Sequence, residues 1–245
     1  FQMIEGEKLG SFWGYTFAGV WQEDDVNAPF VDANGQTNGK TNGEVYKVKP
    51  GNSKYVDVNK DGVYNDADQG IIGCGQPTFN WGWNNTFNYK NFDFSFFVVG
   101  FHGFDIYNAT HQMGYNLIKS QQMAGVTPMR ELLNRWTPTN TNTDIPGFVK
   151  GGTENKDFFS TRFVENGSFI KMKSITLGYT LPEATCRSLG INNLRVYASV
   201  QNPFHITKYS GLDPEATMGS PLVQGVDWGA YPNSRNYLIG LNFSF

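Results

Sequence analysis

One segment of the chain carries oxygen-bearing side chains at the spacing of a calcium-binding loop. It reads Asp57-Val-Asn-Lys-Asp-Gly-Val-Tyr-Asn-Asp-Ala-Asp68. In such loops, oxygen ligands occupy the first, third and fifth positions, a glycine occupies the sixth and an acidic residue the twelfth. The spacing predicts a calcium site formed by Asp57, Asn59, Asp61, the backbone carbonyl of Val63, Asn65 and Asp68.

Two features of this loop limit its role. The twelfth position is Asp68 rather than glutamate, so a shorter side chain must reach the cation, and the chain has no second copy of the loop. The sequence therefore favours structural calcium over a calcium switch. The alternative is a turn rich in Asn and Asp that holds no ion.

No segment of the chain predicts a catalytic site. Neighbouring carboxylates, such as Asp24 with Asp25 or Asp213 with Glu215, lie in polar loops without a nucleophile–base arrangement or a phosphate-binding loop, so we interpret them as solvated charges. We therefore do not expect an enzyme. Four loop aromatics could stack on sugar rings or contact a partner, or could anchor the loops to one another: Trp136, Tyr209, Trp228 and Tyr231.

Residues 127–136 predict a short helix. Thr127 is a candidate N-cap, and Pro128 occupies the first turn. The apolar residues expected on one face are Met129, Leu132, Leu133 and Trp136. We expect this face to pack on the loops, with binding of a partner as the alternative.

The composition excludes several classes of protein. The 245 residues include 19 Lys and Arg against 22 Asp and Glu, a net charge of −3, so no broad basic surface is available for nucleic acid. Two cysteines and three scattered histidines form neither a disulfide framework nor a zinc site. No run of 18 apolar residues predicts a transmembrane helix.

Alternation of apolar and polar residues predicts β-strands with one apolar face. Aromatic residues, which are 16% of the chain, supply much of that face. The regular strands are expected over residues 79–89, 92–101, 174–181, 194–201 and 235–245, with a less regular strand over 11–21.

The connections between these strands differ sharply in length. Short turns join 89 to 92 and 181 to 194, whereas long segments span 22–77, 102–168 and 203–233. Counted from the C-terminus, the short turns fall at one end of the sheet and the long loops at the other. This layout favours an all-β outer-membrane barrel with long extracellular loops over a two-layer soluble sandwich, which also alternates. About six strands cannot close a wide barrel, so residues 1–245 are expected to be the C-terminal segment of a larger one.

Several stretches resemble SusC/RagA-type TonB-dependent outer-membrane transporters. They include KPGNSKYVDVNKDGVYNDADQGIIG at 49–73, QPTFNWGWNNTFNYKNFDFSFFVVG at 76–100, NRWTPTNTNTDIPG at 134–147, STRFVENGSFIKMKSITLGYTLP at 160–182, INNLRVYASVQNPFHITKYSGLDPE at 191–215 and the closing YPNSRNYLIGLNFSF. GSFWGYTFAGVWQ at 10–22 is similar to the segment that precedes these in the family. The resemblance covers nearly the whole chain in the right order.

The resemblance implies a 22-stranded antiparallel barrel in the outer membrane of a Gram-negative bacterium, plugged by an N-terminal domain. It implies import of oligosaccharides or peptides, a SusD-like surface lipoprotein as partner and energy supplied through TonB. On this interpretation, the chain contributes barrel wall and outer loops, and the plug domain, TonB box and signal peptide are absent from it. The calcium-like loop is expected on the extracellular side.

The closing strand resembles the signal that the outer-membrane assembly machinery reads. Its residues are Tyr237, Ile239, Leu241, Phe243 and the terminal Phe245. A free strand edge that ends in an aromatic residue is suited to strand addition.

Two other functions remain as alternatives to import. One is a secreted, soluble, calcium-stabilised carbohydrate-binding β domain, and the other is a pore or scaffold without active transport.

Overall fold

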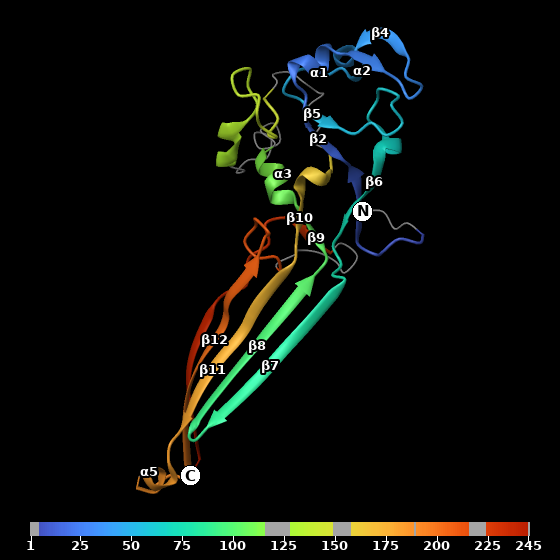
Figure 1. The fold of residues 1–245 in the computed structure, drawn as a ribbon. Coiled ribbons are helices and arrows are strands. Elements are labelled where there is room, and N and C mark those ends of the chain that lie inside the picture. Colours follow the sequence, from blue (N-terminus) through green and yellow to red (C-terminus); the bar gives the residue numbers. More distant parts are fainter. Residues whose placement is uncertain (1–4, 116–127, 149–157, 189, 216–223, 245) are drawn as a thin grey trace. The chain divides into compact units, whose positions relative to one another are not determined.

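The structure is a computed structural model that describes residues 5–115, 128–148, 158–188, 190–215 and 224–244. The chain divides into two compact units (Figure 1). The sheet unit comprises residues 76–106, 165–218 and 230–245, and the loop unit comprises residues 1–75, 107–164 and 219–229.

The sheet unit is built on one five-stranded antiparallel sheet. Its order is β14–β12–β11–β8–β7 (Figure 1). The strands are β7 (Phe79–Tyr89), β8 (Phe92–His102), β11 (Phe169–Thr180), β12 (Asn193–Thr207) and β14 (Asn236–Ser244). The five regular strands predicted from alternation are confirmed, and β11 and β12 extend beyond the predicted ranges.

The register joins the predicted apolar faces into one surface. Directly paired residues form a row across all five strands that runs Leu241, Val196, Tyr179, Phe92 and Tyr89. Side chains on this face are largely exposed, as is Ile239 at 85%. Because apolar side chains line one side of every strand, the sheet has a continuous apolar face.

The opposite face of the sheet is mainly polar. Thr86, Ser95, Thr176 and Ser199 form another row of paired residues, and the Thr176 and Ser199 hydroxyl oxygens lie 2.8 Å apart. The same face carries the Arg195–Asp93 ion pair, which joins two neighbouring rows and in which Arg195 Nε donates to Asp93 Oδ1 over 2.9 Å. A Cβ at Gly178, which lies between these two residues, would collide with both of them.

Within the five-stranded sheet, short and long connections leave from opposite ends. The β7–β8 hairpin turns at Lys90, which has a φ of 53°, and α5 (Glu183–Ser188) lies in the turn from β11 to β12. The long segments 103–168 and 208–235 leave from the other end of the antiparallel sheet. In the described residues, β7 and β14 each have one neighbour, so both edges of the sheet are open.

The loop unit begins with short strands in separate two-stranded sheets. The pairs are β1 (Ser11–Tyr15) with β6 (Gln69–Cys74), β2 (Phe17–Val20) with β5 (Ser53–Tyr55), and β3 (Pro29–Val31) with β4 (Thr37–Thr41). The prediction of one strand over 11–21 is therefore wrong. The ladder changes partner at residue 16, since residues 11–15 pair with β6 and residues 17–20 pair with β5, and the Phe17 N–H donates to the Thr161 hydroxyl over 2.9 Å.

Helices and further short strands complete the described chain, with β9 and β10 lying at the boundaries of the two units. They are α1 (Glu23–Asn27), α2 (Asn42–Tyr46), η1 (Asp66–Asp68), β9 (Asp105–Asn108), α3 (Ala109–Tyr115), η2 (Arg130–Asn134), η3 (Thr161–Phe163), β10 (Val164–Asn166) and β13 (Val226–Asp227). None of the described helices is long and apolar enough to span a membrane. The largest buried cluster of the loop unit contains Phe12, Tyr107, Ala109, Phe163 and Val226.

The predicted helix over 127–136 is replaced by the 3₁₀ turn η2. Thr127 lies outside the described residues, and the backbone is extended at Met129 and Arg135, on either side of η2. Leu132 is 7% exposed but Leu133 is 79% exposed, so the apolar residues do not share one buried face. The Arg135 N–H bonds to the Leu132 carbonyl, three residues back, as in a 3₁₀ turn, and the extended backbone at Arg135 ends it.

Candidate functional site

The predicted calcium loop follows β5 and closes on η1 in the loop unit. Its first residue, Asp57, holds the loop through one oxygen: Oδ2 accepts from the Gly62 N–H over 2.9 Å and from the Tyr46 hydroxyl over 2.8 Å. The other oxygen, Oδ1, is buried and has no hydrogen-bond partner. A buried acceptor without a partner costs free energy, so a cation at this oxygen would satisfy it.

Gly62 is required by the turn it forms. Its φ of 82° is in the left-handed region that favours glycine. A Cβ at this position would also collide with the Val45 side chain of α2. The sixth position of the motif is therefore fixed by both backbone conformation and packing.

The middle of the loop brings three predicted ligands together. Asp61 Oδ2 accepts from the amide groups of Asn59, over 2.9 Å, and Asn65, over 3.1 Å. The Asn65 amide also donates to the Val63 carbonyl over 3.2 Å. Hydrogen bonds lower the pKa of Asp61 from its ordinary value, and the bond from the Val63 N–H has the largest effect, followed by the bond from the Asn59 amide. These groups therefore converge, and a rotation of each amide would present its oxygen instead.

Asp68 closes the loop through the backbone. It is buried, and its two oxygens accept from the Val58 N–H over 2.8 Å and the Asn65 N–H over 3.0 Å. The described residues include no cluster of three His, Cys, Asp or Glu side chains placed to hold a metal. A cation here would therefore depend on the amide and carbonyl oxygens as well as on Asp57 and Asp61.

The sheet unit holds a buried ionic cluster that sequence reasoning missed. The ammonium group of Lys171, a β11 residue only 2% exposed, lies 3.0 Å from Asp213 Oδ2 and 2.7 Å from Glu215 Oε2. Lys173 pairs with the other oxygen of Glu215, and the Asn233 side chain donates to both acids. The interpretation of Asp213 and Glu215 as solvated charges is therefore wrong.

The cluster fixes both stems of the segment between β12 and β14. Asp213 and Glu215 lie on the outgoing stem and Asn233 lies on the returning one. The available signal was two lysines, Lys171 and Lys173, inside a strand otherwise free of charge. Their acidic partners are about 40 residues away in the sequence, so spacing alone did not pair them.

We expect the cluster to make the protein acid-sensitive. Burial, the largest single effect, would raise the pKa of Asp213 and of Glu215, but the hydrogen bonds and charges around them, led by the hydrogen bond from Lys171, together hold each pKa below its ordinary value. These pKa values are lower in the folded state than in the unfolded state, where they are about 4. The cluster therefore contributes its full stabilisation above about pH 4, and this stabilisation is lost as the pH falls through the folded-state pKa values.

Thermal unfolding of the full-length protein in detergent, measured between pH 6 and pH 3, tests this expectation. The wild type should lose more stability across this range than an Asp213→Asn, Glu215→Gln variant, which lacks both titrating groups. An equal loss in the two proteins would contradict it.

The four aromatic candidates in the loops lie in different surroundings. The Trp136 indole donates to the Gln22 side chain over 2.9 Å, and its ring lies against Gly51. Tyr209 is buried with Phe104 and Phe169. Trp228 and Tyr231 are exposed, the latter at 89%.

The predicted assembly signal forms the edge strand β14. Four of its apolar side chains are exposed on the apolar face: Tyr237, Ile239, Leu241 and Phe243. Phe245 lies outside the described residues. β14 pairs only with β12 among the described strands, so its other edge can accept a further strand.

Comparisons with known proteins relate the chain to bacterial receptors, although no family model matches it. It is 35% identical over 98% of its length to TonB-dependent receptor P3 of Formosa agariphila, of which the match covers 22%. It is 32% identical over 80% of its length to TonB-dependent receptor SusC of Bacteroides thetaiotaomicron, of which the match covers 18%. The chain thus spans about a fifth of the length of these relatives.

A solved structure of the RagAB peptide transporter has a similar fold. It superposes on the whole chain with a TM-score of 0.70 and 23% sequence identity, and the match covers 24% of that chain. A RagAB peptide importer in its open-open state aligns over 96% of this chain with a TM-score of 0.68. These neighbours have the fold seen here.

Proposed function

Because the chain belongs to the TonB-dependent receptors of the SusC and RagA type, we propose that it forms part of an outer-membrane nutrient importer. The observation that carries this proposal is the five-stranded sheet, whose apolar side chains line one face and whose polar side chains line the other. In a membrane barrel, the first face contacts lipid and the second lines the lumen.

The rest of the barrel would come from the remaining strands of the full-length protein. β7 and β14 have open edges and can each accept a neighbour, as closure into 22 strands requires. The long segments 103–168 and 208–235 would then form extracellular loops, and the turns at Lys90 and α5 would face the periplasm.

The cargo that we propose is an oligosaccharide or a peptide, taken up with a SusD-like surface lipoprotein and driven through TonB. A relative named SusC and neighbours named RagAB peptide importer support the class of transporter. Transport by this mechanism requires energy coupling, which a passive pore does not.

Uptake by cells that carry the full-length protein tests this function. Fluorescently labelled oligosaccharides and peptides of several lengths are offered to cells with and without the gene, in the presence and absence of a protonophore. We expect accumulation of one class that requires both the gene and the proton gradient. Recovery of the full-length protein as a detergent-free monomer, without accumulation of either class, would support the secreted carbohydrate-binding alternative.

We propose in addition that the loop 57–68 binds one structural Ca²⁺. The buried Asp57 Oδ1 without a partner supports this proposal, together with the convergence of Asn59, Asp61 and Asn65. Asp57→Asn, which removes a charged ligand, is expected to weaken calcium binding about tenfold or more.

Calorimetric titration of the full-length protein in detergent with CaCl₂ checks this prediction. Asp32→Asn is a matched control, because Asp32 is likewise an aspartate that holds a polar turn through one oxygen, which accepts the Asn34 and Gln36 N–H groups. Binding that is absent from the wild type, or that responds equally to the two substitutions, would contradict the calcium site.

A further inference from the structure

Asparagine followed by glycine is the dipeptide most prone to spontaneous loss of ammonia, and the chain contains four such pairs. Three begin at Asn34, Asn38 and Asn42, and the fourth begins at Asn166. The reaction joins the glycine backbone nitrogen to the asparagine Cγ, and glycine favours it because no side chain hinders the approach. The surroundings of each pair decide whether it reacts in the folded protein.

The reaction needs no co-reactant except water. The glycine N–H loses its proton to base as its nitrogen bonds to Cγ, and the bond from Cγ to Nδ2 breaks to release ammonia, which takes up a proton. Water then opens the five-membered imide at either of its two carbonyl carbons. The products are aspartate and isoaspartate, in which the main chain continues through the side-chain carbon. Each carries a negative charge that asparagine lacks.

Asn38 lies in an irregular part of the β3–β4 hairpin. The register pairs Thr37 and Thr41 with β3, and the three residues of β4 between them lie opposite one residue of β3. Such a bulge disrupts the ladder locally. Asn38 and Gly39 are exposed, and a Cβ at Gly39 would meet no described atom within 4 Å. The backbone can therefore adopt the conformation that ring closure requires without breaking a packed interface.

A hydrogen bond prepares the Asn38 side chain for the reaction. Its Oδ1 accepts from the Lys40 N–H over 3.0 Å. This bond closes a ring that contains both the Asn38 Cγ and the Gly39 nitrogen, so the two reacting atoms are held near one another. The same N–H would stabilise the negative charge that develops on Oδ1 as the nitrogen adds to Cγ.

Asn166 has the same kind of hydrogen bond in packed surroundings. Its Oδ1 accepts from the Ser168 N–H over 2.8 Å. Gly167 is buried, and its N–H donates to the Phe104 carbonyl over 3.0 Å. A Cβ at Gly167 would collide with the Phe104 and Ile106 side chains. The attacking nitrogen is thus held by another bond in a packed backbone, so Asn166 should not react in the folded protein.

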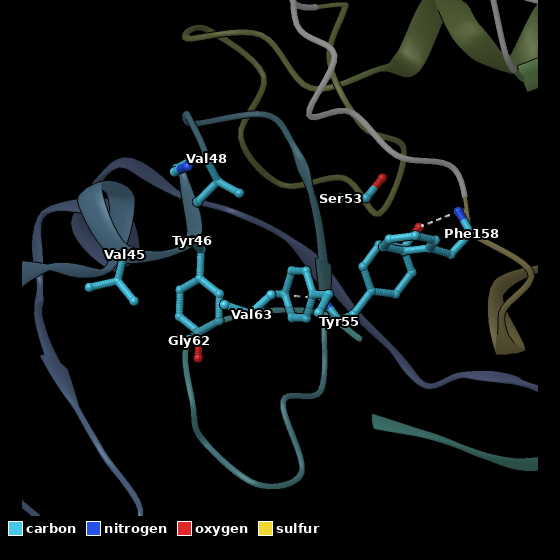
Figure 2. Close-up of a pocket in the computed structure, with 10 residues that line it drawn as sticks. Val45, Tyr46, Val48, Ser53, Tyr55, Gly62, Val63 and Phe158 are labelled. Carbon is cyan, nitrogen blue, oxygen red and sulfur yellow. Dashed lines mark hydrogen bonds between the residues drawn. The ribbon is translucent and has the colours of Figure 1, made fainter. Parts of the chain in front are cut away.

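Asn42 is held at the start of α2. Its Nδ2 donates to the Asp25 carbonyl over 2.9 Å, and a Cβ at Gly43 would collide with a side chain of α1. The end of α2 is anchored as well, because Tyr46 lines a cavity that β5 and Phe158 also line (Figure 2). A helix held at both ends cannot bring the Gly43 nitrogen onto the Asn42 Cγ.

Asn34 combines features of both groups. It is exposed, and nothing in the described chain lies within 4 Å of the place that a Cβ at Gly35 would take. The Gly35 N–H, however, donates to the Asp32 carbonyl over 3.0 Å. This bond must break before the nitrogen can attack, so Asn34 should react more slowly than Asn38.

We propose that Asn38 is a modification site at which the folded protein forms aspartate and isoaspartate without an enzyme. Asn34 reacts more slowly, and Asn42 and Asn166 stay intact. The β3–β4 hairpin therefore gains negative charge as the protein ages. The proposal depends neither on nutrient import nor on the calcium site.

Peptide mapping of the full-length protein tests the proposal. The folded protein in detergent is incubated in mildly alkaline buffer for several weeks, digested with trypsin and analysed by mass spectrometry. Trypsin places Asn42 in residues 41–47 and Asn166 in residues 163–171, and fragment ions separate Asn34 from Asn38 in their shared peptide. Digestion in water enriched in oxygen-18 marks any modification that arises during digestion itself.

We expect conversion of Asn38 to be at least about tenfold faster than conversion of Asn42 or Asn166. In urea, which unfolds all four pairs, the four rates should be similar. Gly39→Ala adds a methyl group that hinders the attack, and it should slow the conversion of Asn38 alone. The comparison in urea keeps the test decisive if this variant disturbs the hairpin, since Gly39 has a φ of 76°.

Three results would overturn the proposal. The first is an intact Asn38, and the second is equal conversion of Asn38 and Asn166 in the folded protein. The third is an Asn38 that remains fastest by the same factor in urea, because the local sequence rather than the fold would then set the selectivity.

Discussion

Replacement of Lys171 by methionine is expected to lower the free energy of unfolding by about 3–5 kcal/mol. Methionine fills a similar volume, but Asp213, which is 4% exposed, would then be left as a buried charge without its cation. Urea unfolding of the full-length protein in detergent, followed by tryptophan fluorescence, measures this loss.

Matched variants separate the ionic cluster from simple packing. Lys173→Met removes a partly exposed ammonium group that, among the described residues, pairs with Glu215 alone, so its effect should be about 1 kcal/mol. A Lys171→Met, Asp213→Asn double variant removes both charges and should recover part of the lost stability. Equal effects of the two lysine substitutions would contradict the assignment of Lys171 as the centre of the cluster.

The second large effect is expected on the apolar face of the C-terminal strand. Leu241→Arg places a charge on the face that we assign to lipid, at a cost that is about 2–4 kcal/mol at the bilayer midplane and smaller toward the interfaces. Asn242→Arg places the same charge on the opposite face, which we assign to the lumen, and should cost much less. The two positions are adjacent in β14, so strand propensity and edge position are matched.

Folding of the two full-length variants into liposomes, measured by their heat-modifiable mobility on gels, reports the difference. We expect Leu241→Arg to reduce the folded fraction severely and Asn242→Arg to leave most of the protein folded. The reverse order, or equal effects, would contradict the assignment of the two faces.

Much of the sheet could be predicted because a strand with one apolar face has a period of two. That pattern located β7 and β8 within a residue of their observed ends, and register then aligned their apolar faces. The alternation across 11–21 failed for a physical reason. Residues before Thr16 pair with β6 and residues after it pair with β5. Which distant strand a residue pairs with does not change the alternation of apolar and polar residues, so the sequence pattern could not show the break.

The site was predictable only where its contacts are local. The hydrogen bonds of the motif from Asp57 to Asp68 join residues that are no more than 12 positions apart. The spacing of residue types was therefore enough to predict the turn at Gly62 and the place of Asp61 beside it. The cluster of Lys171 with Asp213 joins a strand to a distant loop, and the cavity joins α2 and β5 with Phe158. Neither arrangement has a local signature, and both required the structure.

Spin labels on β14 test the central claim that one face of the sheet contacts lipid. Cysteine is introduced in turn at Ile239, Leu241, Asn242 and Ser244 of the full-length protein, after Cys74 and Cys186 have been replaced by alanine. The labelled proteins are reconstituted into liposomes. Collision rates are then measured with oxygen, which concentrates in lipid, and with a nickel chelate, which stays in water.

We predict high oxygen collision rates at 239 and 241 and high nickel collision rates at 242 and 244, in strict alternation along the strand. Low collision rates with both reagents at 239 and 241 would mean that a second protein layer covers these side chains. That result would contradict the membrane barrel and the proposed import function that depends on it.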